Sequence, residues 1–346
     1  NDLGVESTSA IISRPLSVPD GLTIPQYGSG NGSQEDYRII AVPLQLNSAT
    51  VKSIFEDDLG PYDPNEYRLF GYTDQTRELT ANSTLEPGRG YWLIVAGNDR
   101  EMNTGAGRTV AVSKTSAFTL ALNAGWNLIG NPYYFNIGWT EMKAANPGIG
   151  DLRIYDGSFS NGTVLDAMTG GFLFTDTESN ISFPVIKNPA LNNGRNNGDK
   201  KNMRRPELQP GDWEVLLNLA QQDHSYALGG IGMRKEAKSD FDKFDNMSLP
   251  RFGEYLELNH EKEFLGFNYS LDIVPPAIEK SWEFTVESAL SGKTTISWNP
   301  AHLSELNGQL ILLDIDNEWP VDMVSQSSYT FESNGVRHFK AIYGGT

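Results

Sequence analysis

The residues best suited to bind a ligand are three aspartates in a short acidic segment, residues 239–246 (SDFDKFDN). Asp240, Asp242 and Asp245 offer carboxylate oxygens at short intervals, and calcium binds six to eight such hard oxygens. The spacing is not that of an EF-hand, the central glycine of that loop is missing, and Lys243 interrupts the acidic run. Two interpretations of the segment stay open, a solvated acidic loop and a calcium site, and calcium is the candidate cofactor of this chain.

Tryptophans and a second acidic turn supply the other candidate ligand sites. Residues 314–318 (DIDNE) form a further acidic turn that offers oxygen ligands. Trp139 and Trp319 lie in turn-like surroundings and are the candidates for exposed platforms on which a sugar ring stacks, with burial in the core as the alternative. Trp126 and Trp282 alternate with other residues in strand-like segments, and we expect both to face the core.

The sequence contains no recognisable catalytic motif. His260 and Glu261 begin a metalloprotease-like pattern, but Phe264 stands where the second zinc-binding histidine is required. There is no cysteine, and the Gly-x-Ser-x-Gly motif of serine hydrolases does not occur. A glycosidase needs two carboxylates at the right distance, but among 44 acidic residues no pair stands out. We therefore expect no catalytic residues and no enzymatic activity.

Composition limits the partners. The 346 residues carry a formal net charge of −17, which repels nucleic acid and anionic membrane surfaces. No apolar run approaches the roughly 20 residues of a membrane-spanning helix. The lack of cysteine means that packed cores, and not disulfides, provide stability. The chain begins at Asn1 without a signal peptide, so we expect a mature protein or a fragment.

The elements that position these residues begin with a repeat in the first half of the chain. Three segments recur in the same order, each strand-like and rich in aromatic residues or glycine. The matched pairs are residues 37–43 with 126–132, 67–70 with 152–155, and 85–93 with 165–173. We expect the two copies to adopt the same local fold, with residues 90–92 equivalent to residues 170–172.

Short alternating segments and abundant glycine and proline predict an all-β protein. We expect tandem β-sandwich modules, with a duplicated N-terminal unit and an immunoglobulin-like sandwich at the C-terminus. The predicted divisions are 1–36 (end of an upstream module and linker), 37–113 (first repeat), 114–186 (second repeat), 187–205 (exposed basic loop), 206–279 (β-sandwich segment) and 280–346 (immunoglobulin-like domain).

Several phrases resemble modules of large surface and secreted proteins from Bacteroidota-like bacteria, which leave the cell through the type IX secretion system. They are residues 37–46 (YRIIAVPLQL), 85–95 (LEPGRGYWLIV), 125–139 (GWNLIGNPYYFNIGW), 281–286 (SWEFTV) and 328–344 (SYTFESNGVRHFKAIYG). The last two resemble the β-sandwich that precedes the C-terminal sorting domain of these proteins. The "YPNP" phrase that opens that sorting domain does not occur in this sequence.

The resemblance implies an extracellular or cell-surface location, and it implies little about activity. We expect a non-catalytic structural or adhesive region whose partners are other surface proteins or extracellular polysaccharide. The alternatives are a carbohydrate-binding accessory module of a secreted enzyme and a secreted glycan hydrolase. None of the three requires nucleic acid or direct insertion into a membrane.

Overall fold

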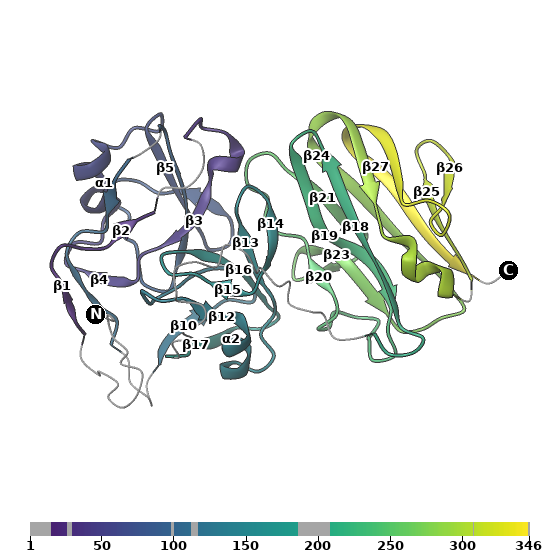
Figure 1. The fold of residues 1–346 in the computed structure, drawn as a ribbon, viewed down its shortest axis with the longest axis horizontal. Coiled ribbons are helices and arrows are strands. Elements are labelled where there is room, and N and C mark those ends of the chain that lie inside the picture. Colours follow the sequence, from purple (N-terminus) through teal and green to yellow (C-terminus); the bar gives the residue numbers. More distant parts are fainter. Residues whose placement is uncertain are drawn as a thin grey trace. The chain divides into compact units, whose positions relative to one another are not determined.

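The computed structural model describes residues 15–25, 30–97, 100–111, 117–185, 208–306 and 308–344. Within these ranges the protein is all-β, as predicted, and the chain divides into two compact units, residues 1–203 and 204–346 (Figure 1). The described residues form two α-helices, and neither is long and apolar enough to span a membrane. The predicted basic loop, residues 187–205, lies outside the described residues.

The first unit contains two copies of one motif. The first copy consists of β1 Ser17–Val18, β2 Thr23–Ile24, a 3-10 turn Gln34–Asp36, β3 Arg38–Ala41, β4 Leu44–Leu46, α1 Val51–Leu59, β5 Tyr67–Tyr72, β6 Thr76–Glu78, β7 Gly90–Val95, β8 Met102–Asn103 and β9 Gly107–Thr109. The second copy consists of β10 Phe118–Leu122, β11 Gly125–Gly130, β12 Ile137–Gly138, α2 Trp139–Ala145, β13 Leu152–Tyr155, β14 Phe159–Gly162, β15 Val164–Leu165, β16 Gly170–Thr175 and β17 Ser179–Phe183.

Both copies build the same four-stranded antiparallel sheet, in the order β3-β7-β5-β6 and β11-β16-β13-β14. The central register is also the same, because Ile39 lies opposite Trp92 in the first copy and Leu128 lies opposite Phe172 in the second. The predicted duplication is therefore confirmed, including the equivalence of residues 90–92 with 170–172.

One part of the repeat alignment made from the sequence is wrong. The alignment matches Arg68 with Arg153. In the structure Phe70 lies opposite Trp92 and Arg153 lies opposite the equivalent Phe172, so Phe70 is the equivalent of Arg153. The difference is two residues along the strand. Because side chains alternate between the faces of a sheet, a shift of two leaves every side chain on its expected face.

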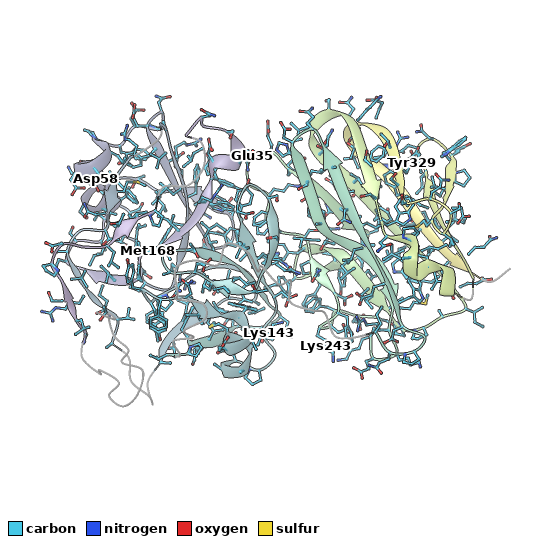
Figure 2. The ribbon with its side chains drawn as sticks, in the orientation of Figure 1. Glu35, Asp58, Lys143, Met168, Lys243 and Tyr329 are labelled. Carbon is cyan, nitrogen blue, oxygen red and sulfur yellow. The ribbon has the colours of Figure 1, made fainter. Side chains whose placement is uncertain are left out.

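The two copies meet through reciprocal contacts, as the halves of a two-fold symmetric dimer do. The Ala41 amide donates to the Met168 carbonyl at 2.9 Å, and the equivalent Gly130 amide donates to the Gly88 carbonyl at 2.8 Å. Met168, labelled in Figure 2, has the positive φ of 64° that matches φ 83° at Gly88.

Aromatic side chains of the two copies also make reciprocal contacts. Tyr155 of the second copy packs edge-on against Trp92 of the first at 4.9 Å, while Tyr72 of the first packs against Phe172 of the second at 5.2 Å. Trp92 and Phe172 occupy equivalent positions and also contact each other at 6.2 Å. The contact between the copies is therefore centred on this aromatic pair.

Glycines permit the close approach of the backbones beside that pair. A Cβ atom on Gly130 would lie 2.3 Å from the Arg89 carbonyl oxygen and 2.6 Å from the Ala41 Cβ. Cβ atoms on Gly90 and Gly170 would lie 2.6 and 2.5 Å from the Ile129 carbonyl oxygen. We call Ala41, Gly90, Gly130 and Gly170 the seam. The glycine of the repeated pattern is thus required by backbone contact between the copies.

Each copy also has its own core, to which its helix contributes one face. In α1 the buried side chains are Val51, Ile54, Phe55 and Leu59, at the spacing of one helical face. The Thr50 hydroxyl accepts a hydrogen bond from the Ser53 amide and caps the helix. In α2, Trp139 and Met142 are buried in the equivalent position.

The second unit is a β-sandwich held together by two long strands. It consists of β18 Trp213–Gln221, β19 His224–Met233, β20 Asn246–Met247, β21 Leu256–His260, β22 Glu263–Phe264, β23 Phe267–Val274, β24 Glu279–Ser297, a 3-10 helix Pro300–Glu305, β25 Gln309–Asp314, β26 Trp319–Asp322 and β27 Ser328–Gly344. The strand order is β20-β23-β19-β18-β24-β27-β25-β26, and β21 also pairs with β24.

Strand β24 changes its partner along its length. Its first half pairs with β21 and its last residues pair with β18, while β27 accompanies both halves. The register shifts between Glu287 and Ser291, and an irregularity of this kind lets one strand pass from one layer of a sandwich to the other. The predicted boundary between residues 279 and 280 is therefore wrong, because the ladders of β24 join the segments on either side.

The predicted upstream module at residues 1–36 is also corrected in its described part. Strand β1 pairs with β9 and strand β2 pairs with β8, so residues 15–25 complete the sheets of the first copy. In the second copy β10 pairs with β17 in the place where β1 pairs with β9. The sequence match began only at Tyr37, and for that reason it missed this edge strand of the first copy.

Replacing Gly130 with alanine is expected to lower the free energy of unfolding by about 1–3 kcal/mol, since the new methyl group overlaps Arg89 and Ala41. Urea unfolding followed by circular dichroism measures the change. Gly71→Ala is the control, because its added Cβ would meet only a flexible Leu79 methyl at 3.4 Å. Equal stability of the two variants would contradict the close approach at the seam.

Candidate functional site

Two glutamates that the sequence did not single out lie next to each other in the second unit. Glu257 on β21 lies directly opposite Glu287 on β24. Directly opposed residues of antiparallel strands point to the same face, so two carboxylates lie side by side there. We call Glu257 and Glu287 the carboxylate pair. Their separation in sequence hides them from any local motif.

Arg251 holds this carboxylate pair together. Its guanidinium donates to Glu257 Oε1 through Nε at 2.6 Å, and its Nη2 contacts both Glu257 Oε1 and Glu287 Oε2. The side-chain amide of Asn259 also donates to both carboxylates, through Nδ2 at 2.9 and 3.2 Å. Ser248 contacts the side-chain oxygen of Asn259. The cluster fastens the segment from Ser248 to Arg251 onto β21 and β24.

The hydrogen bonds of this cluster favour the charged form of Glu287. Burial by itself raises the pKa of Glu287, but hydrogen bonds from Arg251, Asn259 and Thr285 outweigh burial and lower the pKa below its usual value. The general acid of a glycosidase needs the opposite, a raised pKa that keeps its proton near neutral pH. The arrangement therefore suits an ionic clamp better than acid catalysis.

Arg251→Ala would leave two neighbouring carboxylates without their shared cation. We expect unfolding free energy to fall by about 1–3 kcal/mol, with the partial exposure of Arg251 limiting the loss. Urea unfolding at neutral pH measures it. The control is Arg77→Ala, since Arg77 and its partner Asp74 are both well exposed, and there the change should stay within about 0.5 kcal/mol. Equal losses of unfolding free energy in the two variants would contradict the role of Arg251 as the cation that holds the carboxylate pair.

The residues predicted to bind calcium use their carboxylates in local turns. Asp242 accepts hydrogen bonds from the backbone amides of Lys238 and Phe244, at 2.7 and 2.8 Å. Asp245 accepts from the amides of Asp242 and Ile273, both at 2.9 Å. Asp240 is exposed. Among the described residues no group of three or more acidic or histidine side chains is arranged to hold a metal ion, and the calcium site stays a prediction.

Asp245 is an aspartate of this segment whose pKa is clearly shifted. Burial raises the pKa of Asp245 to about 7, against the opposing effect of the two amides that hydrogen bond to it. A buried carboxyl with this pKa keeps its proton through most of the acidic range. The side chain connects the 238–245 turn to β23 through Ile273.

Stability should therefore depend on pH through Asp245. The folded protein retains a proton that the unfolded chain releases near its ordinary pKa of 3.8, so unfolding free energy falls as pH rises from about 4 to about 7, by up to about 1.4 kcal/mol per pH unit. Asp245→Asn should remove this slope, as measured by urea unfolding across that range. Asp240→Asn is the exposed control and should retain it. A variant curve parallel to the wild type would refute the assignment.

The structure confirms some of the predictions for the tryptophans and contradicts one. Trp126 and Trp282 are buried, as expected. Trp139 was expected on the surface, and this is wrong: its side chain is fully buried at the start of α2, and its Nε1 donates to the Gly150 carbonyl at 3.0 Å. The turn-like sequence before Trp139 leads into a helix whose first residue packs inward. Trp319 is 60% exposed and can present its ring to a ligand.

His260, the start of the broken metalloprotease pattern, lies on β21 and is buried. Burial lowers the pKa of His260 to about 4, although the nearby Asp272 opposes the shift. The neutral ring hydrogen bonds through Nε2 with the Gly230 carbonyl at 2.9 Å. Its position connects β21 to β19 across the sandwich.

Comparison with known proteins adds no assignment. No protein-family model matches the chain, and neither the curated proteins nor the solved structures include a match.

Proposed function

We propose that this chain is a non-catalytic, structural and adhesive region of a secreted or cell-surface protein. In this role it spaces and displays neighbouring parts of that protein, and its surface contacts other surface proteins or extracellular polysaccharide. The resemblance of its sequence to secreted Bacteroidota-like modules, including export by the type IX system, supports the location. The net charge of −17 favours partners other than nucleic acid.

The carboxylate pair is the observation that carries this proposal. It brings two carboxylates together on one face of the sheet, and Arg251 and Asn259 both bind its two members. The lowered pKa of Glu287 favours a permanently charged group. A charge held in this way stabilises a fold and is poorly suited to give or take a proton near neutral pH.

The carboxylate pair also provides the test against a hydrolase. Purified protein incubated with neutral and acidic polysaccharides should release no reducing ends above the rate in buffer. Glu287→Gln should lower stability and leave that result unchanged. Release of reducing ends that Glu287→Gln abolishes would overturn the non-catalytic proposal, with Glu283→Gln, an exposed glutamate on the same strand, as the matched control.

A spacer role predicts mechanical behaviour as well. The seam joins the two copies through backbone hydrogen bonds and close-packed glycines, so they should unfold together. When the whole chain is stretched by its ends in single-molecule force spectroscopy, we expect one unfolding step for each of the two units. A further step, in which the two copies of the first unit unfold one after the other, would contradict the prediction that they resist force together.

A further inference from the structure

Trp319 differs from every other tryptophan of the chain. The remaining six, Trp92, Trp126, Trp139, Trp213, Trp282 and Trp298, are all less than 9% exposed, whereas Trp319 is 60% exposed. An indole is among the largest apolar side chains, and its flat apolar face with one polar N–H suits it to contact a ligand that is apolar on one side. Trp319 begins β26, the last strand of its sheet.

The hairpin that presents Trp319 is fixed from two sides. It comprises β25, the turn 315–318 and β26, and we call it the Trp319 hairpin (Figure 1). Trp319 closes the ladder opposite Asp314, which is fully buried. Asp314 accepts hydrogen bonds from the Tyr329 hydroxyl at 2.8 Å and from Arg337 Nη2 at 2.8 Å, and Tyr329 is labelled in Figure 2.

The turn itself is also held. The Asn317 amide and side chain donate to Asp314, at 3.2 and 3.1 Å. On the other side Asp316 accepts from the His338 amide at 2.9 Å and lies 3.3 Å from the His338 ring. Glu318 adopts a positive φ of 51°, which turns the chain into Trp319. The ring therefore projects from a rigid hairpin. Because the turn is already ordered, ligand binding loses little conformational entropy there.

The chemistry around the ring limits what it can bind. Pro320 follows Trp319 on the edge strand, and a proline has no amide proton with which to add a further strand there. Asp316 and Glu318 are exposed beside the turn, although the Asp316 carboxylate already contacts His338 and lies 3.7 Å from Arg337, and the chain as a whole is strongly acidic. These features disfavour strand addition and anionic ligands. They suit a neutral ligand with one apolar face and several hydroxyl donors.

We propose that the Trp319 hairpin binds neutral carbohydrate, with the apolar face of a pyranose ring stacked on the Trp319 indole and its hydroxyls donating to the turn carboxylates of Asp316 and Glu318. The inference rests on the adhesive part of the proposed function and names its ligand class. It makes the hairpin the adhesive point of an otherwise structural unit.

Isothermal titration calorimetry with the whole chain tests this. The probes are soluble neutral oligosaccharides of β-1,4-linked glucose, β-1,3-linked glucose and β-1,4-linked mannose, with oligogalacturonate as the anionic comparison. We expect at least one neutral probe to bind, no binding of oligogalacturonate, and a loss of affinity of about tenfold or more in Trp319→Ala. Trp319→Phe should retain part of the affinity.

Ile278→Ala is the matched control, because Ile278 is 85% exposed in the same unit and tests for general surface hydrophobicity. It should bind as the wild type does. The proposal fails if none of the neutral probes binds, if Trp319→Ala binds as tightly as the wild type, or if Ile278→Ala weakens binding equally. Thermal unfolding of each variant confirms that it is folded. Such a failure leaves the force measurement untouched, so loss of the carbohydrate site and loss of the spacer role are separable.

Discussion

The close approach of two backbones at the seam is the constraint on which the first unit depends. Gly130 and Ala41 occupy equivalent positions in the two copies, yet a Cβ added to Gly130 would lie 2.6 Å from the Ala41 Cβ. The seam therefore has room for one methyl group and not for two. Because Ala41 and Gly130 face each other, the two copies cannot both carry alanine at this position. The strand register is therefore the same in the two copies, whereas the residue at this position differs.

The second unit solves a different problem by different means. Strands β24 and β27 pair with each other along both of their halves, and this continuous ladder connects the two layers of the sandwich. Polar contacts join particular strands of this unit: Arg251 binds the carboxylate pair of β21 and β24, His260 of β21 hydrogen bonds with Gly230 of β19, and Asp245 accepts from Ile273 of β23. A buried polar group costs stability unless it is hydrogen bonded, and these contacts fix which strands pack together.

Sequence predicted the repeat and its core tryptophans because both are expressed in local patterns. Alternation placed Trp126 and Trp282 in the core, and the recurring glycine marked residues 90 and 170. The carboxylate pair could not be found in this way. Glu257 and Glu287 become neighbours only through the register of β21 on β24, and no spacing along the chain records that ladder. Trp139 was misplaced because the sequence around it is typical of a turn, although the turn leads into a buried helix.

The contrast between Asp245 and Asp314 shows why acidic composition alone cannot identify a ligand site. Both lie in aspartate-rich turns that look alike in sequence, and both are buried. Asp245 accepts hydrogen bonds from backbone amides, and burial raises its pKa to about 7. Asp314 meets the Arg337 guanidinium, which offsets the cost of burying its charge. The first carboxyl fastens a turn to the strand behind it, whereas the second holds a turn rigid so that the next residue, Trp319, can face the solvent.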